Sequence, residues 1–174
     1  MKKIFIVLTY TGTFPAKIVK FWTRKAYSHV SISLDENLTR MYSFARLGQY
    51  NIFNAGFLHE NIHKGIYKRF QNTEALIGYI EVSNRQYKRI EKDIQKMEQE
   101  RDKYRFNIIG FLAVTIRRKR QRKNYFYCAE FVRYLLNEAY INNELPDIII
   151  PTDFQKLKDL KYVYKGKLKD YAVA

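Results

Sequence analysis

The chain has 174 residues and a formal net charge of +15 at pH 7, with 47% hydrophobic and 28% charged residues. This length predicts one domain, over residues 1–174, with a full hydrophobic core, and the composition excludes a largely disordered chain. The positive charge indicates either a lysine-rich, well-solvated surface or an anionic partner, such as an acidic membrane surface, another polyanion or nucleic acid. It carries no information about the fold.

The N-terminal residues predict a strand rather than a targeting segment. Lys2 and Lys3 precede the short apolar run IFIVL, which TYTGT then interrupts, whereas a signal peptide needs about 7–15 apolar residues. No apolar stretch approaches the ~20 residues of a membrane span. A single cysteine is typical of a reducing compartment. We therefore expect a cytoplasmic protein, with peripheral contact to a membrane as an alternative.

The first third of the chain predicts strands with one helix between them. Residues 3–10 are rich in β-branched side chains and predict a strand, and residues 13–26, with a proline near their start, predict a helix. SHVSISL (28–34) alternates strictly and, with the turn residues DEN and RMYSFA (40–45), predicts a hairpin. Residues 46–63 show no clear periodicity and are expected to form a loop.

The middle of the chain predicts two strands and a long charged helix. IYKRF (66–70) and ALIGYIEV (75–82) are expected to be strands. A capping-box sequence, S-x-x-Q, starts at Ser83 and predicts the beginning of a helix. Apolar residues then recur at steps of three and four from Tyr87 to Tyr104, which predicts one apolar stripe on this helix.

An apolar segment followed by a basic one lies next. YRFNIIGFLAVTI (104–116) is too short to span a bilayer, and RRKRQRK (117–123) has six cations in seven residues. The pair predicts either a buried helix with a solvated loop, or a surface that docks on an acidic membrane. Nucleic-acid binding is a further alternative, although the sequence shows no zinc-ligand spacing, no RNA-recognition aromatic motif and no helix-turn-helix.

The only cysteine lies at the start of the next predicted helix. Apolar residues recur there at helical spacing: Cys128, Phe131, Val132, Leu135, Leu136 and Ala139. A cysteine on such a stripe is either a small core residue or a nucleophile. The unpaired backbone N–H groups at a helix N-terminus stabilise an anion, either a thiolate or the oxyanion of acyl transfer.

The remaining residues predict an extended segment, a short helix and a final strand. Residues 147–160 give the extended segment and a helix capped by Thr152 or Asp153, and KYVYK (161–165) gives the strand. Together the elements predict an α+β fold in which the cysteine helix packs across an antiparallel sheet. That sheet is expected to contain 28–34, 40–45, 66–70 and 75–82, with 3–10 near its start.

His29 is the predicted partner of the thiol. It lies on the strand face opposite Val30 and Ile32, so it need not be a core residue. A cysteine and a histidine that meet in space are the minimum for a thiolate–imidazolium pair.

The other two histidines belong to the string HENIH. His59, Glu60 and His63 have the spacing of a zincin HExxH helix, but no apolar helical stripe surrounds them and no third ligand is evident. We therefore expect no metal site and no cofactor.

Two strings carry a resemblance to a known family. SHVSISL and, about a hundred residues later, YCAEFV resemble the NlpC-type papain-like cysteine peptidases, in particular their circularly permuted branch of YiiX-like and lecithin–retinol acyltransferase-like proteins. In that branch the histidine strand precedes the cysteine helix, as in this sequence. The PTDF segment is similar to a proline-containing turn of the family, and the likeness covers about residues 3–165.

The resemblance implies a permuted papain-like fold in which Cys128 is the nucleophile and His29 the general base. The implied activity is a thiol hydrolase or acyltransferase that acts on a peptide, amide or lipid-ester bond through an acyl-enzyme. A non-catalytic basic module that binds an anionic membrane or nucleic acid through residues 117–123 is the alternative function.

The remaining site residues also follow from the resemblance. The third polar position of the family falls at Ser43, where a stronger hydrogen-bond acceptor is usual. Glu60 or His63 is an alternative residue for orienting the imidazole, and Tyr10 is a candidate oxyanion donor.

Overall fold

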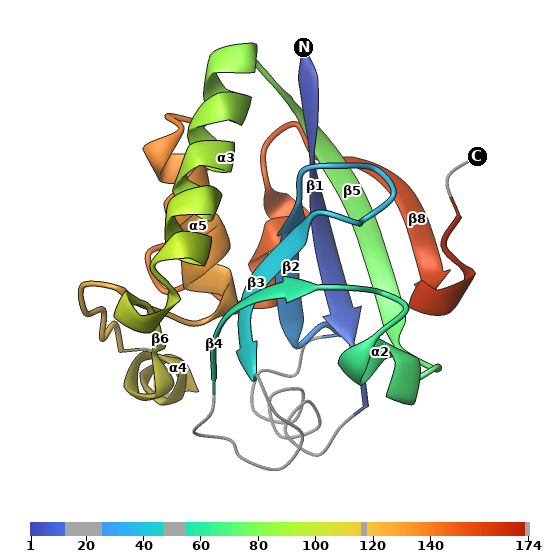
Figure 1. Ribbon diagram of the computed structural model, residues 1–174, viewed down its shortest axis with the longest axis horizontal. Coiled ribbons are helices and arrows are strands. Elements are labelled where there is room, and N and C mark those ends of the chain that lie inside the picture. The colour runs from blue at the N-terminus through green and yellow to red at the C-terminus, as the bar shows by residue number, and fades with distance from the viewer. Residues whose placement is uncertain (13–25, 47–54, 116–117, 173–174) are drawn as a thin grey trace.

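A computed structural model of the protein describes residues 1–12, 26–46, 55–115 and 118–172, and the fold is α+β (Figure 1). The strands are β1 (Lys2–Tyr10), β2 (His29–Ser33), β3 (Met41–Arg46), β4 (Ala55–Glu60), β5 (Glu74–Val82), β6 (Arg105–Phe106), β7 (Tyr125–Phe126) and β8 (Lys161–Lys167). The α-helices are α2 (Gly65–Arg69), α3 (Asn84–Gln99), α4 (Ile108–Thr115) and α5 (Cys128–Glu138), and the 3-10 helices are η1 (Arg101–Lys103), η2 (Pro151–Lys156) and η3 (Leu168–Asp170). The helix expected over 13–26 lies, apart from Ala26, outside the described residues.

The main sheet has six strands in the order β4-β3-β2-β1-β5-β8, and every neighbouring pair is antiparallel. The predicted hairpin and the strands predicted at 3–10, 75–82 and 161–165 are confirmed. Strand β1 is central rather than peripheral, because Thr9 pairs with His29 on one side and with Ala75 on the other. The start of β2, where His29 lies, is therefore paired with a central strand.

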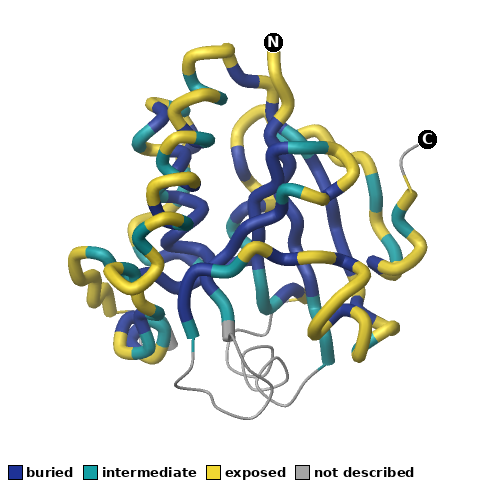
Figure 2. Tube along the Cα trace, viewed as in Figure 1, coloured by how far each residue is buried: buried dark blue, intermediate teal, exposed yellow. Residues whose placement is uncertain are grey.

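The two faces of the sheet are covered differently. Alternating residues of β1 belong to two cores: Ile6 lies in the core shared with α3 and α5, and Val7 lies in the core that Tyr67 of α2 and Leu168 of η3 complete. Helices α3 and α5 lie together on one side of the sheet in Figure 1. Figure 2 shows that the central strands of the sheet are largely buried. A two-sided core of this kind fixes the sheet rigidly.

Helix α3 begins at the predicted capping box. The Ser83 hydroxyl accepts from Gln86 N–H at 3.2 Å, and the Gln86 side chain accepts from Ser83 N–H at 2.9 Å. The helix ends at Gln99, so the predicted stripe is confirmed as far as Met97, which is buried, but Tyr104 lies beyond the helix. No helix within the described residues is long and apolar enough to cross a membrane.

Two predictions for the segment after β3 are wrong. Residues 66–70 were expected to be a strand and instead belong largely to helix α2, because a five-residue run with β-branched and aromatic side chains fits either structure. The loop expected over 46–63 contains β4, an edge strand that pairs with β3. The burial of its residues does not alternate strictly, since Gly56 and Phe57 are both buried.

The predicted cap of the short helix after α5 is also wrong. The 3-10 helix η2 begins at Pro151, and its N-cap residue is Ile150. Asp153 lies inside the helix and accepts the Ile150 N–H at 2.9 Å, whereas the Thr152 hydroxyl donates to the Tyr27 carbonyl at 3.2 Å.

Candidate active site

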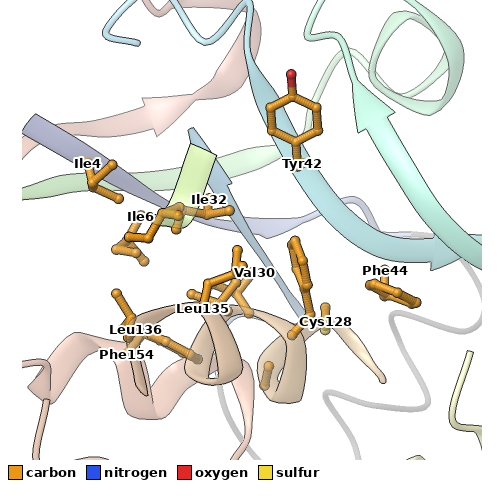
Figure 3. Close-up of a cluster of buried hydrophobic side chains, with 14 of the residues drawn as sticks. Ile4, Ile6, Val30, Ile32, Tyr42, Phe44, Cys128, Leu135, Leu136 and Phe154 are labelled. Carbon is orange, nitrogen blue, oxygen red and sulfur yellow. The ribbon is translucent and has the colours of Figure 1, made fainter. Parts of the chain in front are cut away.

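Cys128 is the first residue of α5, as predicted. The whole apolar stripe of that helix is buried, and Figure 3 shows Cys128 beside Val30, Phe44 and Leu135 in the core on the α5 side of the sheet. Cys128 itself is 5% exposed. Its position in the first turn places the side chain next to backbone N–H groups that have no partner within the helix.

The first turn of α5 is fixed by buried polar contacts. Glu130 reaches back to accept the Tyr127 N–H at 3.2 Å, and the Tyr127 hydroxyl donates to the Ile149 carbonyl at 2.8 Å. Asn107, which is fully buried, donates to Glu130 at 3.0 Å. Burial raises the pKa of Glu130, and the hydrogen bond from Asn107 opposes that rise. These contacts hold the residue that carries the thiol in one orientation.

His29 is the first residue of β2 and pairs with a buried carboxylate. Its Nε2–H donates to Glu60 Oε1 at 2.7 Å, across β3 from the end of β4. The Ser31 hydroxyl lies 3.2 Å from the same nitrogen. Because residues two apart in a strand share a face, His29 and Ser31 point together toward Glu60.

Three hydroxyl groups complete the surroundings of Glu60. Ser43 donates to Oε1, Ser31 donates to Oε2 at 2.8 Å, and Tyr67 of α2 donates to Oε2 at 2.9 Å. With His29, each carboxylate oxygen therefore accepts two hydrogen bonds. This arrangement satisfies a carboxylate that is 5% exposed and holds it in its ionised form.

The pKa values of the pair move apart. Burial alone raises the pKa of Glu60, but the positive charge of His29 and the hydrogen bonds from His29, Ser43 and Ser31 lower it to about 2. Burial alone lowers the pKa of His29, but the charge of Glu60 and hydrogen bonds with Cys128 and Glu60 raise it to about 10. At neutral pH His29 is therefore an imidazolium next to a carboxylate.

Cys128 acts on His29, because its charge and a side-chain hydrogen bond are among the causes that raise the pKa of His29. Glu60 and Ser31 occupy the side of the ring that carries Nε2. The order of contacts is cysteine, imidazole, carboxylate, which is the order that activates a thiol nucleophile.

The other predicted residues occupy different places. Ser43 contacts Glu60 rather than His29. Of the two residues expected to orient the imidazole, Glu60 contacts it directly and Ser43 contacts Glu60. Tyr10 ends β1 and packs, partly buried, against the core on the α5 side. His63 is exposed in the turn before α2.

The HENIH string does not form the helix of a zincin. Glu60 ends β4, so His59 and Glu60 point to opposite faces of a strand. His59 stacks on Tyr42 at 4.7 Å between ring centroids, with its Nε2 2.7 Å from the Thr39 carbonyl oxygen. In the described part of the chain, no three His, Cys, Asp or Glu side chains are grouped so that they could hold a metal.

Sequence reasoning did not find two members of this network. Ser31 shares its strand face with His29, so the alternation of SHVSISL contained the signal that it could contact the imidazole or its partner. Tyr67 carried no such signal, because it belongs to the segment that was expected to be a strand. Its contact with Glu60 depends on the helical turn that brings α2 back over β4.

The His29–Glu60 pair predicts a pH window of stability. Because the pKa of His29 rises from 6.5 to about 10 on folding, its contribution is complete below pH 6.5 and is lost as the pH rises toward 10. Because the pKa of Glu60 falls from 4.5 to about 2, its contribution is complete above pH 4.5 and is lost as the pH falls toward 2. We expect the pair to stabilise the fold most between pH 4.5 and 6.5.

Urea unfolding of the wild type and of Glu60→Gln across this pH range measures the effect. The difference in unfolding free energy between the two proteins should be largest inside the window and smaller on both sides. A difference that stays constant with pH would show that Glu60 acts through packing alone.

Comparison of the chain with protein-family models, with curated proteins and with solved structures gave no match.

Proposed function

We propose that the protein is a cysteine hydrolase or acyltransferase that acts on an amide or ester bond through a covalent acyl-enzyme. The observation that carries the proposal is the contact of Cys128 with His29, whose imidazole is paired with the buried Glu60 carboxylate. Perturbed, coupled groups of this kind are common at catalytic sites, and a nucleophile next to an oriented base is the signature of covalent catalysis.

Cys128 would supply the nucleophile. In the reactive state the proton resides on His29, and the thiolate attacks the carbonyl carbon of the substrate. A C–S bond forms while the carbonyl electron pair moves to oxygen. The first-turn N–H groups of α5 would hold that oxyanion.

His29 would then act as the general acid. It gives its proton to the departing nitrogen or oxygen, the bond to the leaving group breaks, and a thioester remains on Cys128. Water, or an acceptor amine or alcohol, loses a proton to His29 as it attacks the thioester. The C–S bond breaks, the acyl group leaves on the attacking atom, and the Cys128 thiolate is restored. Glu60 would orient the imidazole and stabilise its charged form throughout.

The order of the elements supports the same proposal at the level of fold. The histidine strand β2 precedes the cysteine helix α5, which is the order that the permuted papain-like enzymes show and that the sequence resemblance implied. We propose a permuted papain-like arrangement on this basis. A cytoplasmic location, which keeps a lone thiol reduced, fits this activity.

Trapping of an acyl-enzyme tests the proposal. The purified protein would be incubated with activated esters, such as p-nitrophenyl acetate and butyrate, and with acyl-peptide amides, and its intact mass followed with time. We expect one acyl group per chain, on Cys128 and removable by hydroxylamine. No adduct under conditions in which the protein remains folded, or an adduct that persists in Cys128→Ala, would contradict the proposal.

A further inference from the structure

Helix α4 is the described helix whose apolar side chains are left most open to solvent. Ile109 is 55% exposed and Leu112 is 59% exposed, and they lie three residues apart on one face of the helix. On the opposite side, Gly110 is buried, and Phe111 and Val114 pack against the core. The helix at the lower left of Figure 1 therefore has an inner face packed on the protein and an outer face that is apolar and open.

Cations border the open apolar face. Ile109, Leu112 and Ala113 line a shallow pocket of about 280 Å³ together with Arg118 and Arg120. In the described part of the chain, no carboxylate lies within ion-pair distance of either arginine, whereas the neighbouring Lys119 pairs with Asp147 at 3.5 Å. The guanidinium groups of Arg118 and Arg120 are exposed and remain for an external anion.

Buried contacts fix this surface in place. Asn107 accepts the Gly110 N–H at 2.9 Å and donates to the Arg120 carbonyl at 2.8 Å, so the basic segment is tied to the helix. A Cβ at Gly110 would lie 2.1 Å from Asn107 Nδ2 and 2.7 Å from the Arg120 carbonyl oxygen. The close approach requires glycine. These contacts fix the orientation of α4 and therefore determine which of its faces is exposed.

We propose that this surface, which we call the α4 patch (Ile109, Leu112, Arg118 and Arg120), docks the protein on an anionic lipid bilayer. A bilayer offers both partners that the patch requires, namely an apolar interior for the isoleucine and leucine and negatively charged headgroups for the arginines. Nucleic acid would match the arginines but would leave the two aliphatic side chains in contact with water, since bases stack on aromatic rings. The net charge of +15 adds a general attraction to the same surface.

A series of side-chain contacts connects the α4 patch to the candidate nucleophile. Phe111 of α4 packs on Tyr127 at 6.1 Å between ring centroids, and Tyr127 is the residue before Cys128. Asn107 joins the start of α4 to Glu130 of α5. Docking through α4 would therefore bring the first turn of α5 toward the membrane. The docking proposal itself does not depend on catalysis.

Vesicle co-sedimentation tests the docking. The full chain would be mixed with vesicles of phosphatidylcholine alone and of phosphatidylcholine with phosphatidylglycerol at physiological salt. We expect binding to the anionic vesicles only. The double variant Ile109→Ser/Leu112→Ser should weaken binding by at least about tenfold, because two aliphatic side chains no longer leave water. Arg118→Gln/Arg120→Gln should also weaken it, by about fivefold for each cation removed near the surface.

Two matched controls separate the patch from bulk properties. Lys165→Gln/Lys167→Gln removes the same charge from exposed residues of β8, and Tyr162→Ser/Val163→Ser removes exposed apolar side chains from the same strand. Both control proteins should bind as the wild type does, and so should Cys128→Ala. Circular dichroism and thermal melting establish that every variant is folded.

Three results would overturn the proposal. The first is equal binding of the wild type and Ile109→Ser/Leu112→Ser to anionic vesicles, which would assign the interaction to net charge. The second is no binding to either vesicle together with salt-sensitive binding to a DNA duplex. The third is self-association of the wild type, in size-exclusion chromatography without lipid, that the Ile109→Ser/Leu112→Ser change abolishes, because a second copy of the chain would then cover the patch.

Discussion

Replacement of Cys128 by alanine is expected to reduce turnover of any ester or amide substrate by roughly 10³–10⁶-fold, the range seen when the nucleophile of a catalytic triad is removed. The physical reason is that no other group of the described site can form the acyl-enzyme: Glu60 is enclosed by four hydrogen-bond donors and His29 is engaged with it. Steady-state assay of the substrate that labels the wild type measures the loss.

Cys128→Ser provides the matched control for size. It keeps the volume of the side chain and a hydrogen-bond donor, but a hydroxyl next to an imidazolium is a much weaker nucleophile than a thiolate. Both variants should melt within a few degrees of the wild type, because only one atom is removed or exchanged at the edge of the core. Retention of most of the activity in Cys128→Ala would locate the reaction elsewhere.

Replacement of Glu60 by glutamine is expected to have the second large effect, on both the charge of His29 and turnover. The change keeps the shape of the side chain but removes the negative charge that holds the pKa of His29 near about 10. Without it the largest of the causes that raise this pKa is lost, so burial should lower the pKa of His29. Turnover should fall by about 10²–10⁴-fold, since the carboxylate of a triad orients the base and stabilises its cation.

NMR titration of the imidazole resonances measures the first of these effects. The chain has only three histidines, so His29 is readily assigned, and His59 and His63 serve as references outside the network. In the wild type His29 should stay protonated through neutral pH, and in Glu60→Gln its pKa should fall. An identical titration of His29 in both proteins would refute the role of Glu60.

A surface substitution controls for charge removal in general. Glu144→Gln breaks the exposed pair of Glu144 with Lys158, and exposed pairs contribute about 1 kcal/mol or less. Glu60→Gln, in contrast, removes one partner of a buried pair, for which losses of about 3–5 kcal/mol are typical. Chemical unfolding of both variants at pH 6 should therefore separate them clearly.

The elements that could be predicted from the sequence are those whose apolar residues repeat with a single period, either that of a strand or that of a helix. The strict alternation of SHVSISL placed Val30 and His29 on opposite faces of β2, and the spacing of the α5 stripe predicted both the helix and its first residue, Cys128. In each case enough apolar residues recur at regular spacing to distinguish the period of a strand from the period of a helix.

The partner of His29 was harder to predict, because it depends on sheet order. Glu60 reaches His29 only because β4 pairs with β3 at the edge of the sheet, and no local pattern in FLHEN indicates that pairing. Ser43 was placed on the correct strand and face, yet β4 supplies a stronger acceptor that lies between it and the imidazole. The partner of the imidazole is therefore determined by the pairing of β4 with β3, which no local sequence pattern indicates.

The exposure of α4 could not be derived from the sequence either. NIIGFLAVTI is apolar on all sides, so its pattern does not show which face packs on the protein. The buried amide of Asn107 and the close approach at Gly110 determine that face, and they direct Ile109 and Leu112 outward.

The central claim is that Cys128 and His29 form one ionic pair, and alkylation of the only thiol tests it most directly. The rate of reaction with iodoacetamide would be measured against pH in the wild type and in His29→Ala, each shown to be folded at every pH used. An ordinary thiol gives a profile with its midpoint near pH ~8.5, and activated thiols give midpoints of roughly 3.5–7.5. We predict that the thiol of the wild type reacts rapidly at neutral pH and that the thiol of His29→Ala reacts much more slowly there. A thiol that reacts only when the protein unfolds, or a profile that is the same in both proteins, would contradict the account.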